Sequence, residues 1–246
     1  MRPLVGKRYW LVGASEGLGL ALAQKLVAVG AEVIVSARNA ERLADVVEEL
    51  GSLARAVPVD VADRASVDAA AAEVGEIDGM VFLAGVYWPM KSGDWNADDA
   101  ETMADINFTG AVRTVGAVLP AMVERGAGHI VLTGSLSGFR GLPGAVGYGA
   151  SKAAVMSLAE TMYADLRGTG VDVQLANPGF IKTRLTDKND FDMPFLMEPD
   201  DAAEAMLVLM RSFVFKANFP YLFGALFRLS QFLPDWAYYR LFSKSH

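Results

Sequence analysis

Cysteine is absent from this chain of 246 residues, and histidine occurs only twice. A chain without cysteine forms no disulfide and offers no thiolate to a metal ion. The two histidines, His129 and His246, are too few for a metal site built on imidazole groups. The sequence therefore predicts a protein without disulfides and without a metal centre.

An excess of basic residues is also lacking, since 22 lysines and arginines stand against 29 acidic residues and the net charge is −7. Proteins that bind nucleic acids neutralise phosphates with basic patches, so we expect no nucleic-acid partner. Residues Met1 to Leu4 run almost directly into an apolar strand and leave no room for a signal peptide. We therefore expect a cytoplasmic protein.

The composition is that of a globular protein, with 52% hydrophobic and 21% charged residues. A chain of this length can bury the core of one large α/β domain. It contains no internal repeat, low-complexity tract or linker. We therefore expect residues 1–246 to form one cofactor-binding and catalytic domain, with 213–246 as an apolar, basic C-terminal extension.

Short apolar runs alternate with segments of helical spacing, such as 40–50 and 150–167. Several of the runs are almost continuously apolar, which is typical of parallel strands covered by helices on both faces. The pattern predicts a Rossmann-like, doubly wound parallel sheet of about seven strands. The expected strands lie near 8–12, 32–36, 54–59, 78–83, 129–134 and 171–176, with a seventh at Phe213-Val214-Phe215.

Tyr148 and Lys152 are four residues apart and therefore share one face of a predicted helix. A lysine ammonium favours the phenolate form, so it would lower the pKa of a tyrosine from its usual value near ~10. Ser135, from another segment, offers a hydroxyl that can hold a substrate oxygen. These groups suit proton transfer to or from a carbinol oxygen. The alternative is an ordinary helix face that carries an incidental tyrosine and lysine.

A glycine-rich turn connects the first apolar strand to a helix that begins near Leu20. Its glycines, Gly13, Gly17 and Gly19, let the backbone turn sharply and approach a pyrophosphate. The following helix then offers free N–H groups and a positive dipole end to the anion. Strand, glycine turn and helix in this order predict a dinucleotide site, whereas the turn alone would be weak evidence.

Taken together, these motifs resemble those of the short-chain dehydrogenase/reductase family, in the branch whose chains are about as long as this one. Their order and spacing carry the resemblance, and they extend over most of the chain. The motifs are Gly13-Ala14-Ser15-Glu16-Gly17-Leu18-Gly19, Asp60-Val61, Ala84-Gly85, Asn107, Ser135, Tyr148 with Lys152, and Pro178-Gly179-Phe180-Ile181-Lys182-Thr183.

The resemblance implies four catalytic residues. Tyr148 would be the general acid in reduction and the base in oxidation. Lys152 would lower the pKa of the tyrosine and hold the nicotinamide ribose. Ser135 would bind the substrate oxygen, and Asn107 would connect Lys152 to a proton-relay water. Asn107 and Ser135 also have plain structural interpretations, as a buried helix residue and as a loop serine.

The resemblance also implies a set of cofactor-binding residues. Among them, Asp60 would bind the adenine amino group, although it could instead cap a helix over 61–74. The loop at Pro178-Gly179 would seat the nicotinamide amide and the phosphates. The full set is Gly13, Ser15, Glu16, Gly17, Leu18, Gly19, Arg38, Asp60, Val61, Ala84, Gly85, Tyr148, Lys152, Pro178, Gly179, Ile181 and Thr183.

The end of the second strand favours NADP(H) over NAD(H). Ala37 occupies the position where NAD-preferring relatives usually carry an acid that binds the ribose 2′-hydroxyl. Arg38 follows, and its planar guanidinium can pair with a 2′-phosphate. Glu16 points the other way, because many NADP-preferring relatives have a basic residue there.

Two departures from the family pattern concern the cofactor loop. Val12 precedes the first glycine where threonine is common, and Phe82-Leu83 replaces a pair of asparagines. The missing polar groups put the rigidity of the loop in doubt. The segment Gly13–Gly17 also matches the GxSxG elbow of hydrolases, but neither histidine is placed to complete a triad.

Segment 213–246 is rich in bulky apolar and aromatic residues and carries four basic residues against the single acid Asp235. Its run Tyr221–Leu233, interrupted by Arg228, is too short to span a bilayer. Three alternatives remain open. The segment packs on its own domain, forms a contact in a homo-oligomer, or lies in a membrane interface as a peripheral contact.

Segment 184–199 is expected to form a lid over the substrate. Its apolar residues, together with Tyr87, Trp88, Phe139 and Leu142, predict an apolar pocket, unless they only seal the core. The sequence therefore predicts an NADP(H)-dependent oxidoreductase that interconverts a carbonyl and a secondary alcohol on an apolar small molecule. The alternatives are a non-catalytic nucleotide-binding protein and a sugar-nucleotide epimerase.

Overall fold

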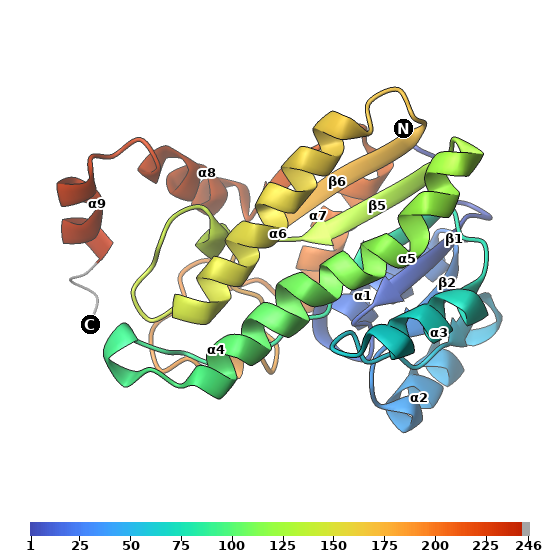
Figure 1. The fold of residues 1–246 in the computed structure, drawn as a ribbon, viewed down its shortest axis with the longest axis horizontal. Helices are drawn as coiled ribbons and strands as arrows, with labels where there is room; N and C mark the ends of the chain where they lie inside the picture. The colour runs from blue at the N-terminus through green and yellow to red at the C-terminus, as the bar shows by residue number, and fades with distance from the viewer. Residues whose placement is uncertain (243–246) are drawn as a thin grey trace.

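The computed structural model describes residues 1–242 and confirms the doubly wound α/β fold (Figure 1). The strands within these residues are β1 (Arg8–Val12), β2 (Glu32–Ser36), β3 (Ala54–Ala56), β4 (Gly79–Phe82), β5 (Gly128–Thr133), β6 (Val171–Pro178) and β7 (Lys216–Phe219). The α-helices are α1 (Gly17–Ala28), α2 (Ala40–Leu50), α3 (Arg64–Val74), α4 (Ala97–Ala104), α5 (Gly110–Arg125), α6 (Val146–Asp165), α7 (Pro199–Arg211), α8 (Tyr221–Ser230) and α9 (Asp235–Phe242).

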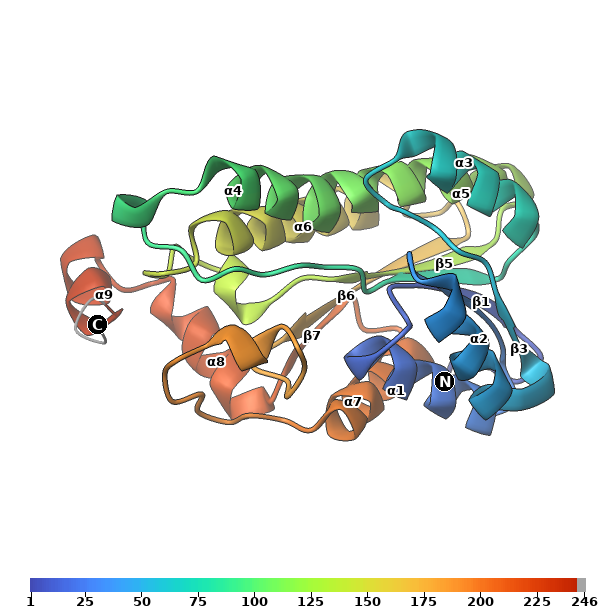
Figure 2. The same cartoon turned by 90° about the horizontal axis from the view of Figure 1, so that it is seen from below.

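All seven strands described lie in one sheet in the order β3-β2-β1-β4-β5-β6-β7, and every pair in it is parallel. The order reverses between β1 and β4, which is the switch point where such sheets bind ligands. Helices α3, α4, α5 and α6 cover one face of the sheet, and α1, α2 and α7 cover the other (Figure 2).

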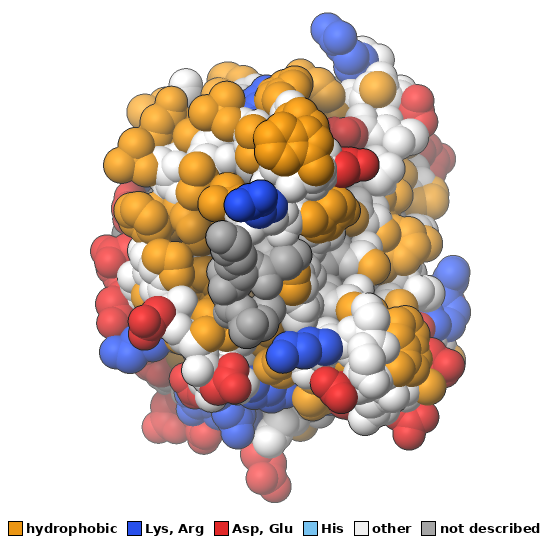
Figure 3. Space-filling view, turned by 90° about the vertical axis from the view of Figure 1, so that its left-hand side faces the viewer, with side chains coloured by type: hydrophobic (Ala, Val, Ile, Leu, Met, Phe, Trp, Pro, Cys, Tyr) orange, Lys and Arg blue, Asp and Glu red, His pale blue; other side chains and the backbone are white. Residues whose placement is uncertain are grey.

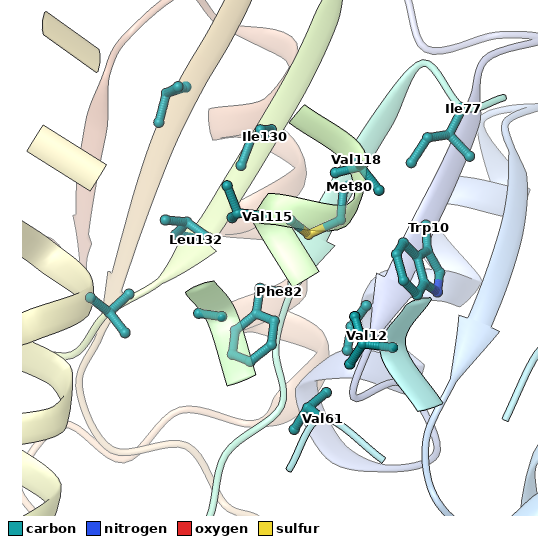
Figure 4. Close-up of a cluster of buried hydrophobic side chains, with 14 of the residues drawn as sticks. Trp10, Val12, Val61, Ile77, Met80, Phe82, Val115, Val118, Ile130 and Leu132 are labelled. Atoms are coloured by element: carbon teal, nitrogen blue, oxygen red, sulfur yellow. The ribbon is translucent and has the colours of Figure 1, made fainter. Parts of the chain in front are cut away.

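Because both faces are covered, residues that alternate along a strand are all buried. Trp10 and Val12 of β1 point into the core beneath α3 and α5, beside Phe82 (Figure 4). Tyr9 and Leu11 of the same strand enter the opposite core, beneath α1 and α7. This two-sided burial explains why the strands are almost continuously apolar in sequence.

Helix caps set two of the element boundaries that matter for the site. Asn39 accepts a hydrogen bond from Arg42 N at 2.9 Å and begins α2. Asp63 accepts one from Ala65 N at 2.9 Å and begins α3. The alternative role of Asp60 as the cap of a helix over 61–74 is therefore wrong. Because that helix starts three residues later, Asp60 stays in the loop that follows β3.

The seventh strand was predicted at Phe213-Val214-Phe215 and lies instead at Lys216–Phe219. Phe213 and Val214 are 71% and 58% exposed, so their apolar character does not mark a buried strand. Strand β7 is at the edge of the sheet, where it pairs with β6 through Lys216 opposite Leu175. Edge strands carry half-exposed polar residues, which hides them from a search for apolar runs.

Residues 97–125 form one helical run that is long and apolar enough to cross a membrane by length and composition alone. In the fold this run covers the sheet, next to α6 (Figure 2). A core helix passes the same test, so the run carries no argument about membranes. Its middle, Asp105–Thr109, widens into a π turn that contains Asn107. Such turns often mark functional positions in helices.

The last two helices follow the edge strand β7 and lie at the end of the molecule away from α2 and α3 (Figures 1 and 2). On α8, Phe223 and Phe227 are buried against Leu136, so this part of the extension packs on its own domain. On α9, Tyr238 is buried and lies under the guanidinium of Arg140 at 4.0 Å from the ring centroid. The basic residue Lys244 lies outside the described residues.

Candidate active site

A cleft of about 560 Å³ lies at the carboxyl ends of the parallel strands. Loops that follow strands β1 to β6 form its walls. Every residue predicted to bind the cofactor lines it: Gly13, Ser15, Glu16, Gly17, Leu18, Gly19, Arg38, Asp60, Val61, Ala84, Gly85, Tyr148, Lys152, Pro178, Gly179, Ile181 and Thr183. The fold thus collects residues from positions 13 to 183 into one site.

The glycine loop turns sharply at one wall of this cleft. Gly13 has a φ of 97°, and a Cβ atom there would overlap the backbone of Ala84. Gly13 N donates to Ser36 O at 2.7 Å, and Leu83 N donates to Val12 O at 2.8 Å. Backbone hydrogen bonds and close packing therefore connect the loop to the sheet where the family's asparagines are missing.

The residues present fit a dinucleotide. Helix α1 starts at Gly17, and Glu16 before it makes no side-chain capping bond, so the N–H groups of its first turn are available to phosphate oxygens. Deeper in the cleft, the buried hydroxyl of Thr133 has no hydrogen-bond partner among the described residues. An anion-binding helix end and an inner polar group match a ligand with phosphates at its middle and a polar ring at one end.

Tyr148 and Lys152 lie side by side on α6, as their spacing predicted. Lys152 Nζ is 5.6 Å from the centroid of the Tyr148 ring. It donates a 2.9 Å hydrogen bond to the carbonyl oxygen of Thr133. Lys152 is only 4% exposed, and burial lowers the pKa of its ammonium to about 8.

The sequence predicted that Lys152 lowers the pKa of Tyr148, but in the structure the pKa of Tyr148 is raised. Burial raises the pKa of Tyr148 to about 12, the nearby Ser135 hydroxyl opposes this shift, and Tyr87 adds to it. The ammonium of Lys152 lies over the ring and bonds to Thr133, so it does not offset the loss of water. Desolvation outweighs the charge of the lysine in this arrangement.

Ser135 lies between β5 and a short 3₁₀ turn and is 7% exposed. Its Oγ accepts hydrogen bonds from Ser137 N at 3.2 Å and from Ser137 Oγ at 2.9 Å. The Ser137 bonds fix the rotamer of the Ser135 hydroxyl beside Tyr148. These two bonds use both lone pairs of the Ser135 oxygen, so its hydroxyl proton is the part that can meet a substrate oxygen.

Asn107 is fully buried and joins the π turn to the loop after β4. Its Oδ1 accepts from Val86 N at 2.7 Å, and its Nδ2 donates to Val86 O at 3.0 Å and to Ser151 Oγ at 3.0 Å. A Cβ atom on Gly85 would lie 3.4 Å from Asn107 Oδ1 and 3.7 Å from Lys152 Nζ. Asn107 therefore holds the cleft wall next to the lysine.

The far end of the cleft carries the residues that bear on the cofactor type. Ala37 and Arg38 both line it after β2, and Arg38 is exposed without an ion-pair partner among residues 1–242. Asp60 Oδ1 accepts from Ala62 N at 3.0 Å, which orients its carboxylate at the loop after β3. This end offers a free guanidinium and an oriented acid.

Several cleft residues were missed by the sequence reasoning as cofactor or site residues. Arg184 donates to Glu16 Oε2 at 2.9 Å and so connects segment 184–199 to the glycine loop. Lys188 Nζ donates to Tyr87 O at 2.8 Å, and Tyr87 OH donates to Asn189 Oδ1 at 3.0 Å. These contacts hold segment 184–199 across the cleft.

Thr133 and Gly134 were also missed. Thr133 is the last residue of β5 and Gly134 follows it, at the carboxyl edge of the sheet, where the rule for parallel sheets could have predicted them.

Comparison with known proteins agrees with this geometry. Residues 7–193 match the family model for short chain dehydrogenases. A protein of Myxococcus xanthus called an uncharacterized oxidoreductase is 39% identical over 232 residues, which are 92% of each chain. The chain belongs to the short-chain dehydrogenase/reductase family. A similar protein of Staphylococcus epidermidis, also called an uncharacterized oxidoreductase, is 33% identical over 80% of this chain and 87% of its own.

Solved structures of short-chain dehydrogenases share the fold. A serine dehydrogenase from Escherichia coli is 31% identical, has a TM-score of 0.77, and is matched over 86% of this chain and 95% of its own. A variant of actinorhodin polyketide ketoreductase with NADPH is 26% identical, has a TM-score of 0.81, and is matched over 89% and 97%. The chain is therefore an oxidoreductase of a family that binds nicotinamide cofactors and acts on small molecules.

Proposed function

We propose that this short-chain dehydrogenase interconverts a carbonyl group and a secondary alcohol with NADP(H), and that its substrate is an apolar small molecule. The observation that carries the proposal is the pairing of Tyr148 with the buried Lys152 at the inner end of a dinucleotide cleft. Ser135 lies beside them with hydrogen-bonding capacity to spare. A protein that only bound the nucleotide would have no use for this set of proton-transfer groups.

The chain's own residues would handle the proton. When bound, the nicotinamide supplies or accepts the hydride. Tyr148 OH donates its proton to the substrate oxygen in reduction and takes it back in oxidation. Ser135 holds that oxygen through its hydroxyl. The ammonium of Lys152 stabilises the negative charge left on Tyr148 and offers protons to the ribose hydroxyls.

Asn107 would act on the geometry of the site. Its three hydrogen bonds fix the Val86 backbone and Ser151, both next to the proton-transfer groups. Through this position it would also support a water chain that leads from Lys152 to solvent, as the resemblance implies.

The preference for NADP(H) rests on Arg38 and Ala37. A 2′-phosphate would meet the free guanidinium of Arg38, while Ala37 offers no acid to a 2′-hydroxyl. Glu16, the residue that pointed to NAD(H), pairs with Arg184 at 2.9 Å. This ion pair offsets the negative charge that the phosphates would otherwise face.

The apolar substrate is supported by an aromatic cluster next to the cleft residue Gly179, where a Cβ atom would lie 3.0 Å from the Phe223 ring. Phe180 contacts Phe191 and Phe223, with ring centroids 5.8 and 5.9 Å apart. Phe139 and Leu142 pack on the same cluster.

Residues 1–246 would work as one domain, in a cytoplasmic homo-oligomer of the kind common in the family.

Substitution of Tyr148 by phenylalanine tests the proposal. Tyr148→Phe should reduce the rate of NADPH oxidation with a simple ketone by a factor of about 10²–10⁴, the usual contribution of a general acid. NADPH affinity, measured by calorimetry, should stay within about twofold because the hydroxyl serves the substrate. Tyr163→Phe is the matched control, since Tyr163 stacks on Phe215 away from the cleft. Unchanged turnover in Tyr148→Phe contradicts the mechanism.

A further inference from the structure

Helix α8 is apolar on two different faces. Phe223 and Phe227 are buried against the domain at 7% and 6% exposure. Leu222, Leu226 and Leu229 form a second stripe at helical spacing and are 70%, 52% and 67% exposed. A helix of a soluble domain normally turns one apolar stripe to the core and a polar face to water. The second apolar stripe of α8 is therefore not covered by any other part of the chain that the structure describes.

This stripe is part of a larger surface. Phe232 is 83% exposed in the turn after α8, and Trp236 is 74% exposed on α9. Phe195 of segment 184–199 is 55% exposed and stacks on Phe223 with ring centroids 5.3 Å apart. We define the C-terminal apolar surface as Phe195, Leu222, Leu226, Leu229, Phe232 and Trp236. Figure 3 looks at this end of the molecule, where hydrophobic side chains cover much of the visible face.

The charges on α8 and α9 are positive. Arg228 and Arg240 are exposed and have no carboxylate within ion-pair distance in the part of the chain that the structure describes. The one acid of α8 and α9, Asp235, is bound by Arg140. Glu160 lines the same hollow as Arg228, and it is bound by Lys216 at 2.8 Å. Helices α8 and α9 thus combine exposed apolar side chains with two unpaired arginines, in a protein whose net charge is −7.

These charges decide between two occupants of the surface. In a twofold contact between two copies, the same patch meets itself, so the interface would gather the free arginines of both copies, while the acid of α8 and α9 is already bound by Arg140. In a membrane with anionic lipids, the negatively charged headgroups would contact the arginines, and the acyl chains beneath them would contact the leucines. Exposed tryptophan and tyrosine, here Trp236 and Tyr221, are typical of that boundary.

We propose that the C-terminal apolar surface binds peripherally to an anionic lipid bilayer. The surface adjoins the cleft through segment 184–199, whose first part lines the cleft and whose Phe195 packs on α8. An apolar ketone dissolved in the bilayer would therefore reach the site without crossing water. This delivery rests on the proposed function, whereas the membrane contact itself does not.

Flotation with lipid vesicles tests the contact. The full chain should float with vesicles of equimolar phosphatidylcholine and phosphatidylglycerol, and more weakly with phosphatidylcholine alone. Combined Leu222→Ser, Leu226→Ser and Leu229→Ser should weaken the partitioning by more than about tenfold, because three apolar side chains leave the bilayer. The matched control is Val112→Ser with Val123→Ser and Val208→Ser, at positions 42%, 40% and 60% exposed elsewhere.

Two further readouts identify the surface. Brominated phosphatidylcholine should quench the fluorescence of Trp236, and Trp236→Phe should remove most of that quenching. Arg228→Gln with Arg240→Gln should abolish the preference for anionic vesicles, while added salt should weaken it in the unmodified chain. The leucine variant should keep its activity with a water-soluble ketone, since none of the three residues touches the cleft.

Absence of flotation with either vesicle overturns the proposal, as does equal flotation of the leucine and control variants. A fall in oligomer mass of the leucine variant, with no vesicle binding by the unmodified chain, would assign the surface to a second copy. Flotation needs no turnover, so the two proposals fail separately. A chain that reduces soluble ketones without floating refutes only the membrane contact, and one that floats without activity refutes only the carbonyl chemistry.

Discussion

The ammonium of Lys152 is held 2.9 Å from the carbonyl oxygen of Thr133, at the carboxyl end of the neighbouring strand β5. This single bond offsets only part of the free energy that burial of the ammonium costs, because the side chain is almost fully buried. The same burial places the charge beside Tyr148, where the chemistry would need it. The site therefore has a group that is useful for proton transfer and unfavourable for stability.

Replacement of Lys152 by methionine should expose this conflict. At pH 7 both the folded and the unfolded chain hold the lysine proton, and a pKa of about 8 instead of 10.5 corresponds to a cost of about 3 kcal/mol. The variant also loses the hydrogen bond to Thr133 O, which lowers its stability by about 1 kcal/mol. Lys152→Met should therefore raise the free energy of unfolding by about 2 kcal/mol in urea titrations, and it should abolish turnover.

The sign of the pH dependence follows from the same pKa. Between pH 8 and 10.5 the unfolded chain binds more protons than the folded chain, so the stability of the unmodified protein rises with pH. The advantage of Lys152→Met should thus shrink by about 1 kcal/mol from pH 7 to pH 9. Lys91→Met, at an exposed position, is the control and should show no such trend. An advantage that grows with pH would contradict the burial argument.

The fold could be predicted closely from the sequence where burial and capping agree. Strands 8–12 and 32–36 were predicted with their observed bounds because both are apolar runs of a central sheet. Helix 40–50 was predicted from its helical spacing, and the structure has the same bounds, with Asn39 as the N-cap and Gly51 at the end. Strand β7 was misplaced because an edge strand carries no such apolar run.

The site divides in the same way. The cleft lining was predictable since motif positions follow strands whose ends must meet. The pKa of Tyr148 was not, because its direction depends on how much water the fold removes and on which acceptor Lys152 reaches. The contacts of Tyr87 and Arg184 depend on where segment 184–199 lies, and no motif encodes that.

Arg38 should determine the cofactor preference. Arg38→Ala removes a charged partner of the 2′-phosphate and should weaken NADPH binding by about 10–100-fold, the value of one or two charge-assisted hydrogen bonds. NADH affinity should change less than about twofold, because NADH lacks that phosphate. Calorimetric titration with both cofactors measures the two values. Equal loss for NADPH and NADH would mean that Arg38 serves the fold of the cleft.

The converse substitution is Ala37→Asp. A carboxylate at this half-buried position after β2 would accept hydrogen bonds from the ribose hydroxyls and repel a 2′-phosphate. NADH should then bind more tightly than NADPH. If Ala37→Asp leaves the order of affinities unchanged, the adenosine ribose does not lie at this end of the cleft.

Asn107 should contribute to stability through its bonds to the loop after β4. Asn107→Ala removes the partner of Val86 N and Val86 O at a half-buried position, which should cost about 2 kcal/mol in urea unfolding. Ser151→Ala removes only the bond to the Asn107 amide and the one to Tyr148 O, and it should cost about 1 kcal/mol. Reversed magnitudes would mean that the Val86 loop finds other partners.

The ion pair between Glu16 and Arg184 should tune the affinity for the cofactor phosphates in opposite directions. Glu16→Gln removes a negative charge beside the start of α1 and leaves Arg184 free, so NADPH should bind about 2–5-fold more tightly. Arg184→Gln leaves the Glu16 carboxylate without its partner at the same place, and NADPH should bind more weakly by a similar factor. Both effects should fall as salt is raised, because both side chains are largely exposed. The NADPH affinity of the double variant should lie between those of the two single variants. If both single variants shift the affinity in the same direction, the pair acts by closing segment 184–199 over the cleft and not through its charge.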